Sequence, residues 1–372
     1  MSVEKNMPFS DEVFADIADQ FGTPTYVYDE AGIRDNARQV NEAFSWSPSY
    51  INYFAVKATP VPAVLRAVKS EGMGFDCSSD TELHIVKRQI GGNNQVFYTS
   101  NNTPDADYRY ADGIGATINI DKLPYLEQVR RALGRLPTTM AIRYNPGELK
   151  KTGDDNSIGE PQYAKFGDTE EHVLDALKHM RDGGVEEIGL HTMLVTNNRN
   201  PESFAETARL LRELAEKAEM RHGIDISFIN IGGGIGVNYH PDEQPVDVAA
   251  IGEAVGSELG PMGIPIVSEN GRYITGPHGY MLTRVTHGII ESHIKFLEVD
   301  TSVNNMARLA TVSSAYHELM VLGREDDPRE LMTVVGSMCA NSDKFFKDRM
   351  LPKTTKPGDL TGHTRCWRPY AV

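Results

Sequence analysis

The sequence predicts an α/β fold in which a (β/α)8 barrel covers residues 35–285, and two observations support this prediction. Eight short apolar runs alternate with helical patterns, as they do in a barrel or in an open doubly wound sheet. Polar side chains stand where these runs end, as at the C-terminal face of barrel enzymes. We therefore prefer the barrel, with strands at 51–57, 74–78, 95–100, 116–121, 138–144, 187–193, 225–231 and 264–269.

Helical patterns fill the intervals between these runs. VPAVLRAVKSEG follows the first strand, TELHIVKRQ the second and LPYLEQVRRAL the fourth. The clearest pattern is PESFAETARLLRELAEKAEM, in which Phe204, Ala208, Leu211 and Ala215 recur at helical spacing after Pro201. Proline is favoured in the first turn of a helix, and this spacing gives one apolar face.

The composition is that of an ordinary globular enzyme. The 372 residues are 40% hydrophobic and 24% charged, and the net charge of −15 argues against a nucleic-acid partner. No run approaches the roughly 20 apolar residues of a membrane span, and the N-terminus lacks the apolar core of a signal peptide. Cys77, Cys339 and Cys366 are too few and too widely spaced for a disulfide framework. We therefore expect a cytoplasmic protein without a membrane partner.

Lys57 is the most informative residue, because it ends the apolar run in INYFAVKAT. Desolvation at the end of a buried strand disfavours a charged amine, and a neutral amine can attack an aldehyde. A strand-end lysine that extends into solvent is the ordinary alternative. The residues at the other strand ends favour the nucleophile.

Several polar residues share this placement at strand ends. They are Asp76 and Ser78 on the second strand, Arg143 and Asn145 on the fifth, His191 on the sixth and Glu269 on the eighth. Each of them alone could be a capping or loop residue. In a barrel they would all lie on one rim, which indicates a site.

The run FINIGGGIG is a strand that opens into a loop of glycines at Gly232, Gly233, Gly234 and Gly236. Glycines let backbone N–H groups approach a phosphate without a Cβ in the way. Barrels commonly bind phosphate in the loops after strands seven and eight. The spacing differs from that of a dinucleotide fingerprint. We favour phosphate binding over a tight structural turn.

Several motifs together resemble the fold-type III pyridoxal-phosphate (PLP) decarboxylases, the family of diaminopimelate, ornithine and arginine decarboxylases. The resemblance runs from Thr23 to Asp359 and includes FAVKA, GFDCSS, AIRYNPG, YAKFG, GLHTM, INIGGGIG, ENGRYITGP, AYHEL and CANSDKFFKDRMLP. It implies PLP as cofactor, a homodimer with shared active sites, and an alanine racemase-like architecture. Residues 1–34 with 286–372 would form the β-rich second domain, and IKFLEVD and ELMTVVGSMCA have the pattern of strands in it.

The resemblance also implies roles for the cofactor ligands. Lys57 matches the Schiff-base lysine, and Glu269 matches the acid that keeps the pyridine nitrogen protonated, so that the ring can accept electrons. Gly232, Gly233 and Gly234, with Arg272, match the phosphate ligands. Asp76 and Arg143 match residues that support Lys57 and the ring.

A second group of implied roles concerns the substrate. Cys339 and Asp343 match the family's C-x-x-x-D motif, which reaches across a dimer interface. We expect Cys339, with Lys57 as the alternative, to protonate Cα, and we expect Asp343 to bind a distal ammonium. Arg308 matches an arginine that binds the substrate carboxylate, and Tyr316 lies in the AYH string.

The chain departs from the family at the strand-six motif, where H-x-H-I-G-S becomes HTMLVT. His191 is retained, Met193 replaces a histidine that stacks on the ring, and Thr196 replaces a phosphate-binding serine. A thioether can pack on a π face but does not titrate. We expect all three residues to contact the cofactor.

Two further departures concern the substrate end of the site and the C-terminus. Ala340 stands where diaminopimelate decarboxylases carry glutamate, and Leu309 replaces a proline beside the carboxylate arginine. After Leu360 the chain reads TGHTRCWRPYAV, where relatives continue with L-x-x-x-D-x-G-A. We expect the β-rich domain to be truncated by a frameshift or sequence error, which resequencing of the gene would test.

These features predict a PLP-dependent α-decarboxylase of a basic or zwitterionic amino acid of the diaminopimelate, lysine or ornithine type, with no metal site. Two alternatives remain. One is an amino acid racemase on the same barrel, which Cys339 and Asp343 disfavour. The other is a non-catalytic decarboxylase-like regulator, which Lys57, the glycine loop and Glu269 disfavour.

Overall fold

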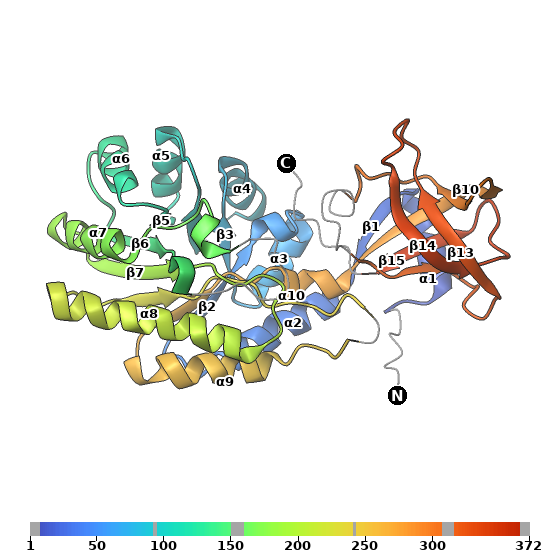
Figure 1. The fold of residues 1–372 in the computed structure, drawn as a ribbon. Coiled ribbons are helices and arrows are strands. Elements are labelled where there is room, and N and C mark those ends of the chain that lie inside the picture. The colour runs from blue at the N-terminus through green and yellow to red at the C-terminus, as the bar shows by residue number, and fades with distance from the viewer. Residues whose placement is uncertain (1–7, 92–94, 150–159, 241–242, 307–315, 365–372) are drawn as a thin grey trace. The chain divides into compact units, whose positions relative to one another are not determined.

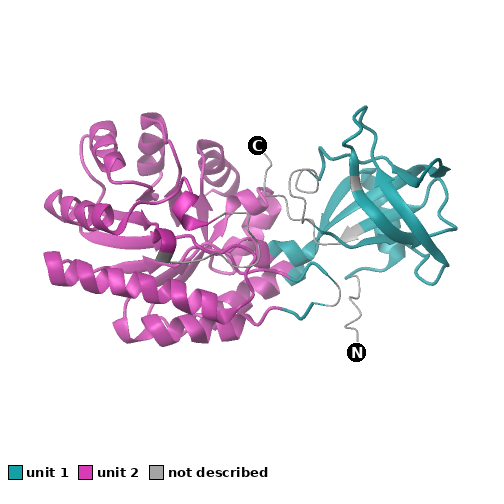
Figure 2. Cartoon of the chain, in the orientation of Figure 1, with its two compact units in different colours: residues 1–32, 238–245, 275–372 teal, residues 33–237, 246–274 magenta. Residues whose placement is uncertain are grey.

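The protein is described by a computed structural model, which covers residues 8–91, 95–149, 160–240, 243–306 and 316–364. The chain forms two compact units (Figure 2). Unit 1 comprises residues 1–32, 238–245 and 275–372, and unit 2 comprises residues 33–237 and 246–274.

Unit 2 is a closed barrel of eight parallel strands (Figure 1). The strand β9 closes the barrel by pairing Ile266 with Tyr50 of β2. Strands form at all eight predicted positions, so the predicted (β/α)8 barrel is confirmed. In barrel order they are β2 (Tyr50–Ala55), β3 (Gly74–Cys77), β4 (Val96–Thr99), β5 (Thr117–Ile120), β6 (Thr139–Tyr144), β7 (Glu187–Thr192), β8 (Phe228–Asn230) and β9 (Ile266–Ser268).

Helices follow the strands and lie around them in Figure 1. The longest of those described, α8 (Pro201–His222), begins at the predicted proline, and the Asn200 side chain caps its first turn by accepting from the Glu202 N–H. No described helix is long and apolar enough to cross a membrane. The other helices of unit 2 are α2 (Glu30–Ala43), α3 (Pro62–Ser70), α4 (Asp80–Ile85), α5 (Asp105–Gly113), α6 (Pro124–Leu133), α7 (Glu170–Asp182), α9 (Val248–Leu259) and α10 (Arg272–Thr275).

Unit 1 is a seven-stranded sheet with the order β12-β15-β10-β11-β13-β14, in which β1 also pairs with β10. Its helix α1 (Asp11–Phe21) packs Phe14 and Ala18 against Tyr280 and Leu282 of β10. The strands are β1 (Thr25–Tyr28), β10 (Gly279–Glu291), β11 (Lys295–Val299), β12 (Leu319–Val321), β13 (Arg329–Val335), β14 (Lys344–Pro352) and β15 (Leu360–Thr364).

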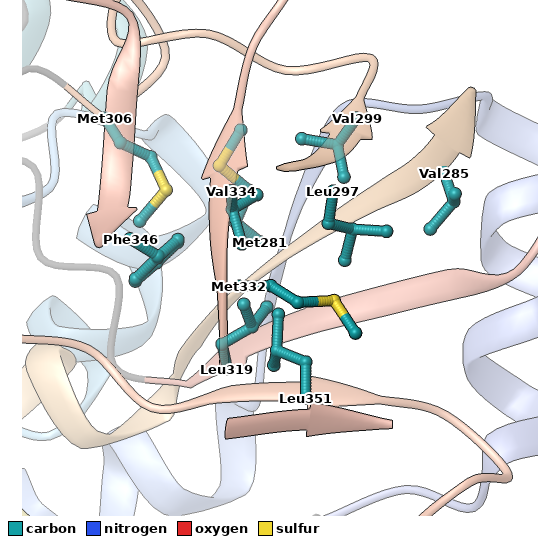
Figure 3. Packing of buried hydrophobic residues seen from close by; sticks show 10 residues of the cluster. All are labelled: Met281, Val285, Leu297, Val299, Met306, Leu319, Met332, Val334, Phe346 and Leu351. Atoms are coloured by element: carbon teal, nitrogen blue, oxygen red, sulfur yellow. The ribbon is translucent and has the colours of Figure 1, made fainter. Parts of the chain in front are cut away.

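The sheet of unit 1 encloses an apolar core of its own, shown in Figure 3. Its members come from five strands and a nearby turn, and each side chain is nearly inaccessible to solvent: Met281, Val285, Leu297, Val299, Met306, Leu319, Met332, Val334, Phe346 and Leu351. Burial of this many apolar side chains stabilises the unit independently of the barrel core. Since β10 belongs to this sheet, the barrel unit ends at Ile274 and not at residue 285.

Candidate active site

Lys57 lies at the C-terminal mouth of the barrel, in a single 3-10 turn (Val56–Ala58) that directly follows β2. Its Nζ is 2.8 Å from Oδ2 of Asp76, the third residue of β3. The Asp76 side chain is 1% exposed, whereas that of Lys57 is 46% exposed. The pair therefore joins a buried carboxylate to an amine that small molecules can reach.

The amine is charged in this arrangement, which corrects the expectation of a neutral lysine. Desolvation disfavours the ammonium, but the carboxylates of Asp76, Glu269 and Glu82 outweigh it and raise the pKa of Lys57 above its usual value. Burial and the Glu269 charge in turn raise the pKa of Asp76 to about 7, although Lys57 works against this. Oδ2 of Asp76, at 2.8 Å from Nζ, is within hydrogen-bond reach of the proton that Lys57 must release before it can act as a nucleophile.

Glu269 directly follows β9 and is held ionised. Its Oε1 accepts from Nδ2 of Asn230 at 2.8 Å and lies 3.4 Å from Nε2 of His191. Burial alone would raise the pKa of Glu269, but His191, Lys57 and the Asn230 amide lower it to about 2. A buried carboxylate of this kind can receive a hydrogen bond from a protonated ring nitrogen.

The positions of these groups follow from strand register and from Asn52 of β2. Arg143 on β6 pairs with His191 on β7, which pairs with Asn230 on β8, so their side chains form one layer. The Asn52 side chain accepts from the Asn270 N–H at 2.8 Å and donates to the Asn270 carbonyl at 3.1 Å. This clamp holds the backbone that carries Glu269.

The glycine loop after β8 packs against the backbones of Glu269, which follows β9, and of Val195, which follows β7. A Cβ on Gly233 would be 2.4 Å from the Glu269 carbonyl, and one on Gly234 would be 2.2 Å from the Val195 carbonyl. Gly232 and Gly234 also have φ of +71° and +103°, which side chains rarely tolerate. Glycine is therefore required here for both space and conformation.

The β7–α8 loop is joined to the glycine loop by paired hydrogen bonds. Asn198 donates to the Gly234 carbonyl at 2.9 Å and accepts from the Gly236 N–H at 2.9 Å. Asn197 adopts φ of 45°, and its Oδ1 accepts from the Val237 N–H at 3.0 Å. Thr196 is half-buried in the same loop, and its role as a phosphate ligand stays a prediction.

Met193 contacts the glycine loop directly, because its sulfur accepts from the Gly233 N–H at 3.3 Å. A thioether is a weak acceptor, and a phosphate oxygen is a strong one. The sulfur thus holds an N–H group that the loop could offer to an anion.

We expect Met193→Leu to lower the free energy of unfolding by about 0.5–1.5 kcal/mol, because the Gly233 N–H loses its acceptor at nearly constant volume. The PLP dissociation constant should fall about threefold, since binding no longer displaces the sulfur. Fluorescence titration with PLP measures this. Met140→Leu, at a buried methionine of β6, is the matched control. Weaker PLP binding by Met193→Leu would show instead that the sulfur supports the cofactor.

Arg143 and Arg272 are both buried at 8% exposure. Arg143 Nη1 lies 3.5 Å from Oδ1 of Asp121, and its guanidinium stacks 4.7 Å from the centre of the Phe166 ring. Burial lowers the pKa of Arg143, although Asp121, Glu269 and Asp76 counteract this. Arg143 therefore lies close enough to Glu269 and Asp76 to interact with their charges.

The predicted substrate residues all belong to unit 1. Cys339 is exposed and has no disulfide. Arg308 lies outside the described residues. The Tyr316 ring stacks on His240 with 3.9 Å between ring centres and faces the Arg349 guanidinium at 3.9 Å, while its hydroxyl donates to Glu318. Its part in substrate binding stays a prediction.

Asp343 is 3% exposed and holds the turn that carries Cys339. Its Oδ1 accepts from the Val303 N–H at 2.8 Å, and its Oδ2 accepts from the Met338 N–H at 2.8 Å. These bonds support a role in organising this turn. The predicted contact with a substrate ammonium stays a prediction.

We expect Asp343→Ala to destabilise the protein by about 2–4 kcal/mol, because two buried N–H groups lose a charged acceptor. The thermal unfolding transition measured by calorimetry should move to a lower temperature accordingly. Asp326→Ala, at an exposed aspartate of the same unit, should change stability by less than about 0.5 kcal/mol. Equal effects of the two variants would contradict the structural role of Asp343.

Sequence reasoning missed several residues that shape the site. Glu82 lies in a segment with a helical pattern, where a charged residue is expected to face solvent. Its carboxylate is nevertheless buried and accepts from the Ser78 N–H at 2.8 Å. Asn52, Asn119 and Asn230 are polar residues inside apolar strands, and this mismatch was the available signal. All three amides make hydrogen bonds inside the barrel.

These features fit the PLP that the sequence predicts. The glycine loop can present N–H groups to a phosphate without a Cβ. Oδ1 of Asp76 and Nε2 of His191 are buried and have no hydrogen-bond partner among the described residues. Lys57 would hold the aldehyde carbon of PLP, Glu269 the ring nitrogen and the glycine loop the phosphate. No group of three or more His, Cys, Asp or Glu residues is placed to hold a metal ion in the described ranges.

Comparison with known proteins gives matches over most of the chain. Residues 30–276 match the family "Pyridoxal-dependent decarboxylase, pyridoxal binding domain". The chain is 33% identical to protein TabA of Pseudomonas amygdali pv. tabaci over 91% of its length and 79% of that protein. It is 33% identical to the diaminopimelate decarboxylase of Methanothermobacter thermautotrophicus, over 93% of its length and 82% of that protein.

A solved structure gives the same result in three dimensions. The diaminopimelate decarboxylase of M. jannaschii, in complex with L-lysine, superimposes with a TM-score of 0.86 at 26% identity. The superposition covers 95% of this chain and 84% of that protein.

Proposed function

We propose that this chain, which belongs to the pyridoxal-dependent decarboxylase family, removes the α-carboxylate of a basic or zwitterionic amino acid. PLP as cofactor and a carboxy-lyase reaction follow from the family. The observation that carries the proposal is the Lys57–Asp76 pair, at 2.8 Å, which interacts electrostatically with the ionised Glu269. The glycine loop adjoins Glu269, whose N–H donates to the Gly232 carbonyl at 2.8 Å.

Each residue has a separate task in this proposal. PLP, when bound, supplies an electron sink for the electron pair that remains when CO2 leaves. Lys57 would hold the cofactor through its amine, and Oδ2 of Asp76 is placed to receive a proton from Nζ. Glu269 keeps the ring nitrogen protonated through its negative charge. The Gly233 and Gly234 N–H groups, Thr196 and Arg272 bind the phosphate, and His191, Met193 and Arg143 surround the ring.

The substrate class rests on charge and on the relatives. The net charge of −15 favours the approach of cationic amino acids. Diaminopimelate decarboxylases recur among the relatives, and one was solved with L-lysine. We propose diaminopimelate, lysine or ornithine as the substrate, with Arg308 binding a carboxylate, Tyr316 lining the site and Asp343 near a distal ammonium.

The reaction is completed by a proton at Cα, for which we propose the Cys339 thiol. Cys339 is exposed, so it can serve a site on a second copy of the chain. We therefore propose a cytoplasmic homodimer with shared active sites. Light scattering gives the mass in solution, and mixing Lys57→Ala with Cys339→Ala chains should restore part of the activity. Absence of any restoration would contradict shared sites.

The proposed function is tested by measuring CO2 release from a panel of L- and D-amino acids with added PLP. We expect release from diaminopimelate, lysine or ornithine and from few others. Racemisation without CO2 would support the racemase alternative. PLP binding without turnover of any amino acid would contradict the proposal.

A further inference from the structure

A chain of buried polar contacts crosses the barrel beneath the site. Asn119 on β5 contacts two neighbours through Nδ2, Oγ1 of Thr99 at 3.0 Å and Nδ1 of His191 at 2.7 Å. Nε2 of His191 lies 3.4 Å from Oε1 of Glu269. Asn119 and His191 are 2% and 1% exposed. These side chains therefore meet without bulk water.

The orientation of the Asn119 amide decides where protons lie in this chain. As placed, the amide donates both its N–H bonds and leaves Oδ1 without a hydrogen-bond partner. The reversed amide would leave two buried N–H groups unpaired, in place of one carbonyl oxygen. Because unpaired N–H groups are rarer in proteins than unpaired carbonyls, the first orientation is favoured.

With this orientation, Nδ1 of His191 is an acceptor and carries no proton. A neutral imidazole has one N–H, which must then be on Nε2. Nε2 is buried, and among the described residues it has no hydrogen-bond partner in good geometry. Oε1 of Glu269, at 3.4 Å, is the acceptor it faces, and such distances tighten when a site is filled.

We infer that Asn119 is a positioning residue, which fixes the His191 proton on Nε2 so that it faces Glu269. Glu269 then receives donors from both His191 and Asn230, which keeps it a carboxylate. The catalytic consequence rests on the proposed function, whereas the proton position does not.

The inference is tested by 15N-histidine NMR of the PLP-loaded and PLP-free protein. The His191 signal is assigned by its loss in His191→Asn. In the unmodified protein we expect a proton on Nε2 and a bare Nδ1. In Asn119→Asp a carboxylate faces Nδ1, so both nitrogens should be protonated. A proton on Nδ1 alone in the unmodified protein, or an unchanged pattern in Asn119→Asp, overturns the inference.

Kinetics and cofactor binding add a second readout. Asn119→Leu should lower kcat about tenfold and leave KM within about twofold, as expected for loss of a supporting partner. The PLP dissociation constant should rise a few-fold. Asn36→Asp, which alters a buried amide bonded to the Tyr273 carbonyl, controls for general destabilisation. Equal kinetic losses in Asn119→Leu and Asn36→Asp overturn the inference.

The proposed decarboxylase function and the proposed position of the His191 proton can be refuted independently. A protein that releases no CO2 would still report the His191 proton by NMR. A proton on Nδ1 would leave the decarboxylase proposal intact.

Discussion

Replacing Lys57 with alanine should lower kcat/KM by at least about a thousandfold, because the amine is the only group proposed to bond the cofactor covalently. The absorbance band of protein-bound PLP should disappear. Asp76, which is 1% exposed, would also lose the partner 2.8 Å away and would favour its neutral form. Steady-state kinetics and absorbance spectra of the purified variant check both expectations.

Lys57→Arg is the sharper control, since arginine keeps the positive charge beside Asp76 but cannot act as a nucleophile. It should retain the fold and remain inactive. Lys69→Ala removes a lysine of α3 that donates to the Gly91 carbonyl and should keep full activity. Borohydride treatment of the PLP-loaded protein should label Lys57. A label on another residue would refute the proposed site.

Glu269→Gln should lower kcat by about 10²–10³-fold, because an amide cannot stabilise the positive ring nitrogen as a carboxylate does. Because the glutamate and glutamine side chains are nearly equal in size, this substitution changes the charge and leaves the packing unchanged. Glu187→Gln, at an exposed residue that begins β7, should be silent. If Glu269→Gln kept more than about half of the activity, Glu269 would not be the partner of the ring nitrogen.

The same variant tests the electrostatics of the site through pH. Burial opposes ionisation of Glu269, but His191, Lys57 and Asn230 lower its pKa to about 2. A lowered pKa adds stability above the unfolded value of about 4.3, and this is lost as pH falls toward about 2. Between about pH 5 and pH 3 the unmodified protein should therefore lose more unfolding free energy than Glu269→Gln. Parallel losses would contradict the lowered pKa.

Most of the barrel could be predicted from the sequence, because its pattern is local. Apolar runs of strand length, separated by helical patterns, occur at all eight positions where the structure has barrel strands. Helix α8 begins at Pro201 as predicted, because proline in the first turn of a helix is also a local signal. The family and cofactor were also predicted, from short motifs, and the comparisons confirm them.

Unit boundaries and charge states depended on contacts between distant residues. The barrel unit ends at Ile274 because β10 pairs with β1, more than 250 residues away in the chain. Lys57 was expected to be neutral from burial alone, whereas three carboxylates from separate segments keep it charged. Electrostatic energy depends on distances in space, which a strand pattern does not contain.

The sequence by itself determined the barrel, the cofactor and the rim on which Lys57, the glycine loop and Glu269 lie. Only the tertiary structure decided how these groups are supported. Asn119, Asn230 and Asn52 reach the site from three different strands. The Met193 sulfur, in the loop after β7, accepts from the Gly233 N–H in the loop after β8. Such hydrogen bonds need atoms within about 3 Å in a fixed orientation, and closure of the barrel produces that proximity.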